Sequence, residues 1–134
     1  MAAGTTGTGD TDARRVLVVA ADLDLLTALE AFISMAFKGL DVATATETKE
    51  AMRILDAWPA QVVVAQHDIP EVQGAQFLRW ARQRRPDIRC VLVAAPHDAP
   101  AGRKAAPAGI PVLVTPFTPQ AFVDLLDVIG DELQ

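Results

Sequence analysis

The chain has 134 residues, a formal net charge of -5 at pH 7 and a sequence pI near 4.8, and this acidity argues against nucleic-acid binding through the whole surface. Hydrophobic residues make up 51% and charged residues 22%, which is a globular composition, and the length fits one domain. The single cysteine, Cys90, excludes an internal disulfide and fits a reducing compartment, and its apolar neighbours indicate a buried thiol.

The first thirteen residues differ in composition from the rest of the chain. Residues 1–13 are rich in Gly, Thr and Asp, so we expect a flexible tail, and residues 14–134 are expected to form the folded domain. The sequence shows no secretion signal. No apolar run approaches the roughly 20 residues that a membrane-spanning helix needs. We therefore expect a cytoplasmic protein that has no membrane partner.

Short apolar runs alternate along the chain with segments of helical periodicity. The runs predict strands at 14–21, 40–46, 60–66, 88–95 and 110–115, and the periodic segments predict helices at 22–38, 48–58, 74–85 and 118–133. Gly39 is expected to end the first helix in a left-handed conformation, and Thr118 is expected to cap the last. Prolines and glycines limit any helix within 96–109 to one or two turns.

This alternation predicts an α/β fold: a flavodoxin-like, doubly wound, five-stranded parallel sheet with helices on both faces. In the strand order 2-1-3-4-5 the functional crevice lies beyond the carboxyl ends of the strands. The residues expected at that edge carry almost no reactive groups. They are Ala20, Ala21, Gln66, Ala94 and Thr115.

The span from about residue 14 to 133 resembles the receiver domain of bacterial response regulators. The stretches that carry the resemblance are RVLVVAAD, VVVAQHDIPEVQG, VLVAA and VTPFTPQAF. In that family a Pro follows the phosphorylated Asp by four residues and a Gly follows the Pro by four. Pro70 and Gly74 fit this spacing, so the resemblance places Gln66 at the phosphoacceptor position.

The resemblance implies further losses at the same site. Ala20 and Ala21 stand where the family has the acidic pair that binds Mg²⁺. Ala94 stands where a Ser or Thr senses the phosphoryl group, and Thr115 where a Lys contacts it.

Other positions concern the part of the family fold that switches. Val112 stands where the family often has a switching aromatic residue. Pro116 and Phe117 keep the family's Pro-Phe pair, and the resemblance implies a cis peptide bond between Thr115 and Pro116. The family's fourth helix, fifth strand and fifth helix meet partners, and here the fourth helix is shortened.

These residues lack the chemistry of phosphoryl transfer. Gln66 offers an uncharged amide in place of a carboxylate nucleophile, and alanines cannot bind Mg²⁺, which requires hard oxygen ligands. Phosphoryl transfer also needs cations that neutralise the transferred group. We therefore predict a pseudo-receiver without metal, cofactor or enzymatic activity. It would act as a phosphorylation-independent protein-interaction module in bacterial two-component or phosphorelay signalling.

The partner surface is expected within residues 96–134, with a homodimer as an open alternative. One functional alternative is a receiver-like domain regulated by a different small ligand in the emptied crevice; a well-formed apolar pocket would favour it. The other is a flavodoxin-like nucleotide-binding protein or enzyme. The absence of a Gly-rich phosphate loop after VLVVAA argues against the latter.

Several polar residues near the expected crevice allow a second interpretation. Asp68 is an alternative acceptor, and Asp22 is either a residual cation ligand or the start of the first helix. His67 and His97 are expected to be exposed loop histidines.

The other conspicuous side chains are basic or aromatic. The basic helix segment holds Arg79, Arg82, Arg84 and Arg85, which form either a phosphate-reading patch or a solvated face. Trp58 and Trp80 are expected in the core or at its rim, with partner binding as the alternative.

Overall fold

The computed structural model describes residues 14–37 and 39–132. Within them the chain alternates strictly between strands and helices. The strands are Arg14–Val19 (β1), Leu40–Ala45 (β2), Val62–Gln66 (β3), Arg89–Ala94 (β4) and Val112–Val114 (β5). The helices are Leu23–Ala36 (α2), Thr48–Ala57 (α3), Gly74–Arg84 (α4), Ala99–Ala105 (α5) and Pro119–Glu132 (α6).

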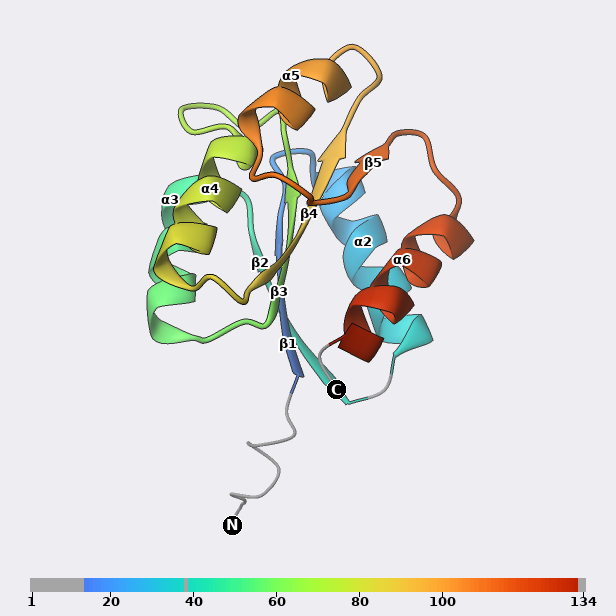
Figure 1. Cartoon of the computed structure of the whole chain (residues 1–134). Coiled ribbons are helices and arrows are strands. Elements are labelled where there is room, and N and C mark those ends of the chain that lie inside the picture. Colours follow the sequence, from blue (N-terminus) through green and yellow to red (C-terminus); the bar gives the residue numbers. More distant parts are fainter. Residues whose placement is uncertain (1–13, 38, 133–134) are drawn as a thin grey trace.

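The strands form one parallel sheet in the order β2-β1-β3-β4-β5. Helices α3, α4 and α5 lie on one side of it, and α2 and α6 lie on the other (Figure 1). The predicted doubly wound fold and its strand order are therefore confirmed. No helix in the described part of the chain combines the length and the apolar character needed to cross a bilayer.

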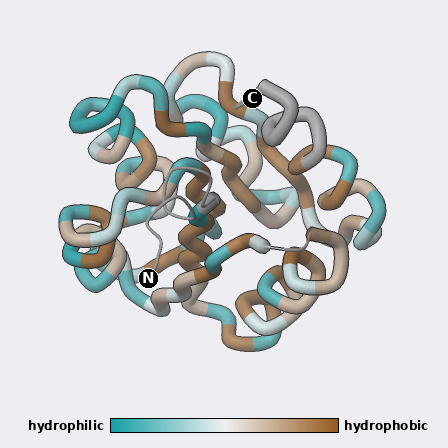
Figure 2. Tube along the Cα trace, turned by 90° about the horizontal axis from the view of Figure 1, so that it is seen from below, coloured by the Kyte–Doolittle hydropathy of each residue, from teal (hydrophilic) through white to brown (hydrophobic). Residues whose placement is uncertain are grey.

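Each face of the sheet has its own hydrophobic core, because successive strand residues point to opposite sides. Leu17 and Val63 pack under α3 and α4 with Phe77. Val18 and Val64 belong to the other core, which is shared with α2 and α6. Figure 2 shows the hydrophobic residues concentrated along the central strands, while hydrophilic segments lie at the periphery.

Local sequence signals explain how the helices that flank the site begin. The Asp22 carboxylate accepts hydrogen bonds from the backbone N–H groups of Asp24 and Leu25, at 3.0 and 3.2 Å, so it caps α2. The Thr118 hydroxyl accepts from the Ala121 N–H at 3.1 Å, and Pro119 takes the first helical position of α6. Both predicted helix starts are confirmed.

Some predicted boundaries were too wide. Helix α2 ends at Ala36 with Phe37 extended, so Gly39, which has φ +79°, sits beyond the helix and does not cap it directly. Helix α5 has seven residues, in agreement with the predicted one or two turns. The predicted tail at residues 1–13 and Leu133 lie outside the described residues.

Candidate functional site

The carboxyl ends of the central strands meet at one edge of the sheet. Gln66 is the last residue of β3 and pairs with Val93 of β4. Ala94 ends β4, and its carbonyl accepts from the Thr115 N–H at 2.9 Å. Ala20 and Ala21 directly follow β1. The structure thus brings together the five residues that the sequence predicts at this edge.

The side chain of Gln66 bridges two segments at this edge. Its oxygen Oε1 accepts hydrogen bonds from the backbone N–H of Ala21 at 2.9 Å and of Asp22 at 3.1 Å. These donors precede the first turn of α2, where backbone N–H groups have no partner within the helix. The amide at the strand end therefore holds the β1–α2 connection in place.

The alanines after β1 have no polar side chain to offer the crevice. Ala20 is fully buried, and its N–H donates to the Ala45 carbonyl at 3.0 Å. Ala21 is partly buried. The nearest acid in sequence, Asp22, already uses Oδ1 to cap α2.

A surface hollow of about 240 Å³ lies beside Gln66. Three acids and no lysine or arginine line it, together with apolar residues and His97. The lining comprises Asp22, Leu25, Gln66, Asp68, Val93, Ala94, Ala95, His97, Asp98 and Thr115. His97 Nε2 lies 3.6 Å from Asp98 Oδ2. The hollow therefore has an acidic rim around a neutral floor.

Ala21 lines a second hollow, of about 230 Å³, which shares no lining residue with the first. Its far wall comes from the start of α3 and from Pro70 and Glu71. Lys49 Nζ and Glu71 Oε1 form an ion pair of 3.1 Å across it. The crevice is thus divided into two small hollows, and the buried Ala20 lines neither of them.

The spacing of Gly74 after Gln66 has a packing reason in this chain. A Cβ at Gly74 would lie 1.9 Å from the Gln66 carbonyl oxygen, and the Gly74 N–H donates to the His67 carbonyl at 3.0 Å. Helix α4 can begin against the end of β3 only if this residue has no side chain. The close approach of the two backbones therefore requires glycine at position 74, whatever residue stands at position 66.

The prediction that His67 is exposed was wrong. Its side chain is only 2% exposed, and its Nδ1 atom has no hydrogen-bond partner in the described part of the chain. A Cβ at Gly102 would approach the ring within 3.6 Å, so α5 covers it. Local sequence could not show this, because the helix that covers the ring lies more than thirty residues away in the chain. His97 is exposed, as predicted.

The peptide bond between Thr115 and Pro116 is cis, as the family resemblance implied. Val112 is partly buried and packs against the core under α3 and α4. Phe117 lies in the opposite core, with its ring centroid 6.1 Å from that of Phe122. The β5–α6 connection therefore keeps the backbone path of the resemblance without its lysine.

Burial changes the pKa of two groups away from the crevice. It raises the pKa of the Cys90 thiol above its ordinary value of 9.0, and nearby Arg82 opposes this shift. Burial also lowers the pKa of Arg85, while Asp87 acts in the opposite direction. Cys90 is a buried free thiol, as predicted, and neither group lines the hollows beside Gln66.

The arginines of α4 make contacts within the chain. Arg79 Nη1 donates to the Ala105 carbonyl at 3.3 Å, and Arg84 Nη2 lies 2.6 Å from Asp56 Oδ1. Arg85 donates to the Ala60 carbonyl. Trp58 and Trp80 are partly buried beside the core, as predicted.

The described residues contain no group of three or more His, Cys, Asp or Glu side chains that could hold a metal ion. Among the described residues at the end of β1, β3 or β5, none supplies a carboxylate to the crevice. Those strand ends carry Val19, Gln66 and Val114, followed by Ala20, His67 and Thr115. The arrangement can position backbone groups and accept hydrogen bonds, but it presents no nucleophile at Gln66.

Comparisons with known proteins agree with this fold. An uncharacterised protein from Neptuniibacter caesariensis is 25% identical with a TM-score of 0.79, over 86% of this chain and 85% of that one. The chemotaxis response regulator CheY4 of Vibrio cholerae is 20% identical with a TM-score of 0.75, over 87% and 98%. The BeF3-activated DrrB receiver domain is 18% identical with a TM-score of 0.74, over 88% and 97%. No curated protein matches the sequence significantly.

A scan against protein families matches residues 16–127 to the response regulator receiver domain. This span contains β1 from its third residue onward, the other four strands and helices α2 to α5 in full, and most of α6. The match and the doubly wound sheet lead to one conclusion: the chain belongs to the response regulator receiver domain family.

Proposed function

We propose that this receiver domain is a pseudo-receiver, which binds a protein partner in one conformation and is not switched by aspartyl phosphorylation. The observation that carries the proposal is the geometry of Gln66. Its amide oxygen is committed to the backbone N–H groups of Ala21 and Asp22. An amide has no negative charge and its nitrogen lone pair is delocalised, so it cannot form an acyl phosphate.

The surroundings of Gln66 support the proposal. Catalysis of phosphoryl transfer depends on positioning and on cations that neutralise the transferred group. The hollow beside Gln66 is lined by Asp22, Asp68 and Asp98 and by no lysine or arginine. Its acidic rim would repel a phosphoryl donor, and Thr115 supplies no positive charge to compensate.

Asp68 does not restore the missing acceptor in this proposal. It is exposed in the loop two residues beyond the end of β3. Gly74 lies so close to the Gln66 carbonyl that there is no room for a Cβ between them. The residue at the strand end is therefore Gln66, not Asp68. We expect Asp68 to remain unmodified.

The size of the hollows favours a protein partner over a small ligand. Sites for small molecules are typically about 300–1,000 Å³. The two hollows at this edge measure about 240 and 230 Å³ and are separate. We place the partner surface within residues 96–134. Helix α5, which has seven residues, is shorter here than the resemblance to the family implies, so this face differs in shape from the usual partner surface.

Incubation with acetyl phosphate and Mg²⁺, followed by intact-mass measurement, tests the phosphorylation part of the proposal. A receiver domain that carries the acceptor aspartate serves as the positive control. We expect the control to gain a base-labile phosphoryl group and this chain to keep its mass. A base-labile adduct on this chain would overturn the proposal, and peptide mapping would show whether Asp68 carries it.

A pull-down from bacterial lysate tests the interaction part. The bait is the full chain, and the comparison bait carries Ala101→Glu on α5 and Ala108→Glu shortly after it, both exposed. We expect a protein that is retained by the parent, and lost with the variant. It should be retained equally with and without acetyl phosphate. Retention that depends on acetyl phosphate would contradict the fixed-conformation role.

A further inference from the structure

The outer face of helix α4 combines positive charge with tryptophan in an otherwise acidic chain. From Gly74 to Arg85 the sequence contains four arginines and no acid, whereas the whole chain has a net charge of -5. Gln76, Arg79, Gln83 and Arg84 are exposed on this helix, and Trp80 is partly exposed among them. We call this set of five residues the α4 face.

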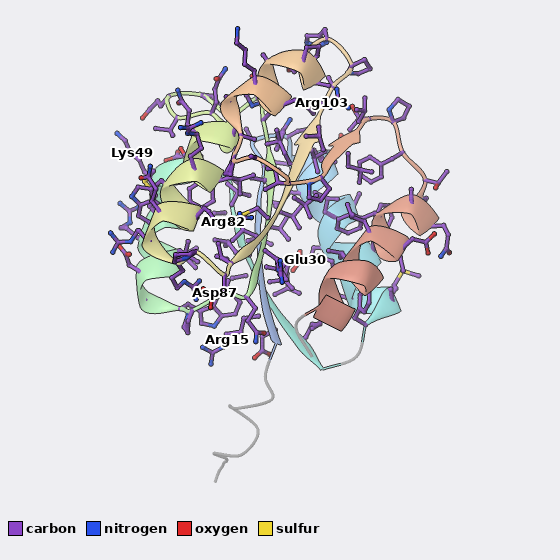
Figure 3. The ribbon with its side chains drawn as sticks, in the orientation of Figure 1. Arg15, Glu30, Lys49, Arg82, Asp87 and Arg103 are labelled. Atoms are coloured by element: carbon purple, nitrogen blue, oxygen red, sulfur yellow. The ribbon has the colours of Figure 1, made fainter. Side chains whose placement is uncertain are left out.

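The α4 face continues toward the end of the sheet at which the parallel strands begin. A hollow of about 350 Å³ lies there between the ends of α3 and α4, lined by Leu55, Asp56, Arg84 and Arg85. Figure 3 shows Arg15 and Asp87 near this edge and Arg103 near the opposite one. The hollow is therefore remote from the end of the sheet where Gln66 lies.

The guanidinium groups on this surface make contacts within the chain, and these contacts leave some of their N–H donors for a ligand. Arg84 lies over the Trp80 ring at 5.0 Å and pairs with Asp56, yet its side chain is 53% exposed. Arg79 contributes one N–H to Ala105. Each guanidinium has five N–H donors, so these contacts use only part of the set. Because these contacts already restrict the arginine side chains, the side chains would lose less conformational entropy when a ligand binds.

We propose that the α4 face and the adjoining hollow bind an acidic segment of a partner protein. Carboxylates match guanidinium groups through paired, charge-assisted hydrogen bonds. The inference deepens the interaction role proposed above by giving the partner's chemistry, and it adds a surface adjoining residues 96–134. The inference does not depend on whether the chain can be phosphorylated.

The same surface is poorly suited to nucleic acid. Single strands gain much of their affinity when bases stack on open aromatic faces. One side of the Trp80 ring is stacked on Phe77, with centroids 5.9 Å apart, and Arg84 covers a face of the ring as well. Trp58 is likewise covered by Arg15 at 5.6 Å. The acidity of the remaining surface would also repel a long polyanion.

Binding of a fluorescein-labelled oligoglutamate peptide, followed by anisotropy at low and physiological salt, tests the proposal. The full chain is compared with Arg79→Gln/Arg84→Gln. The control is Arg103→Gln/Lys104→Gln on α5, which loses the same charge. Both pairs are exposed, and urea unfolding verifies that all three proteins are folded. We expect the α4 variant to bind about tenfold more weakly and the α5 variant to bind like the parent.

The chain contains its own second reporter, because Trp80 belongs to the α4 face and Trp58 follows Asp56, which lines the hollow, by two residues. We expect peptide binding to change their emission, and the change to be absent in the α4 variant. Failure of the parent to bind, or equal loss in the two variants, would overturn the inference. An oligothymidylate of equal charge that binds as tightly as the peptide would overturn the assignment to an acidic protein. None of these results would alter the outcome of the acetyl phosphate assay.

Discussion

The Oε1 atom of Gln66 accepts a hydrogen bond of 2.9 Å from the backbone N–H of Ala21 and so ties the end of β3 to the entry of α2. The Asp22 N–H donates to the same atom at 3.1 Å. One neutral acceptor thus satisfies two backbone donors at the crevice. Gln66 therefore contributes to stability at a position that, in the family resemblance, belongs to the phosphoacceptor.

Replacement of Gln66 by alanine should destabilise the fold. Gln66→Ala removes the shared acceptor and leaves two backbone N–H groups without it, so we expect a loss of about 1–2 kcal/mol in the free energy of unfolding. Gln66→Glu is the matched control, because it keeps an oxygen at the same distance along the side chain. Urea unfolding at neutral pH measures both. Equal stability of Gln66→Ala and the parent would show that the two bonds contribute nothing.

Gly74 is required by the close approach of α4 to β3. In Gly74→Ala the new Cβ would fall 1.9 Å from the Gln66 carbonyl oxygen, so the helix start must move. We expect a destabilisation of about 3 kcal/mol or more, measured by thermal or urea unfolding.

Gly109→Ala separates this clash from backbone strain. Gly109 has φ +84° and no atom within 4 Å of an added Cβ, so alanine there meets only the left-handed backbone, at about 1–2 kcal/mol. The loss should therefore be clearly larger for Gly74→Ala. The same loss in both variants would contradict a specific role for the Gln66 contact.

Much of the fold could be predicted because the deciding signals are local. The apolar runs of β1, β3 and β4 identify buried parallel strands. Asp22 and Thr118 show where helices begin, and Pro and Gly within 96–109 limit α5 to seven residues. The apolar run that ends at residue 66 placed Gln66 at the end of β3. In each case the physical cause lies within a few residues of its effect.

The contacts that decide the site could not be read from the sequence in this way. His67 follows a strand end and resembles a loop residue, but α5 folds over it and Gly102 allows the close contact. Gln66 could be recognised as an amide without a nucleophile, but its bonds to Ala21 and Asp22 depend on two segments about 45 residues apart. Such contacts require the tertiary arrangement.

The buried His67 should be replaceable with a gain in stability. Its Nδ1 has no hydrogen-bond partner among the described residues, and an unsatisfied buried polar atom costs about 1–3 kcal/mol. His67→Leu removes that atom, so we expect the variant to be about 1 kcal/mol more stable at neutral pH. The exposed His97→Leu serves as the control and should stay within about 0.5 kcal/mol of the parent. A less stable His67→Leu variant would indicate that the ring is satisfied.

The Cys90 thiol should make stability depend on alkaline pH. Burial raises the pKa of this thiol in the folded chain above its ordinary value of 9.0, and Arg82 reduces the shift without reversing it. The unfolded thiol loses its proton first as the pH rises. Stability is therefore unaffected below the ordinary value and falls above it, by up to about 1.4 kcal/mol per pH unit until the folded thiol also ionises.

Cys90→Ala tests this dependence because it removes the titrating group. The alanine variant should be less stable than the parent at neutral pH, since it leaves a small cavity beside β4. As the pH rises from about 8 to 10, the parent should lose more stability than the variant, and the difference between them should shrink. Urea unfolding across this range measures both curves. Parallel curves would mean that the thiol ionises equally in the folded and unfolded chain, which would contradict the desolvation of Cys90 within the sheet.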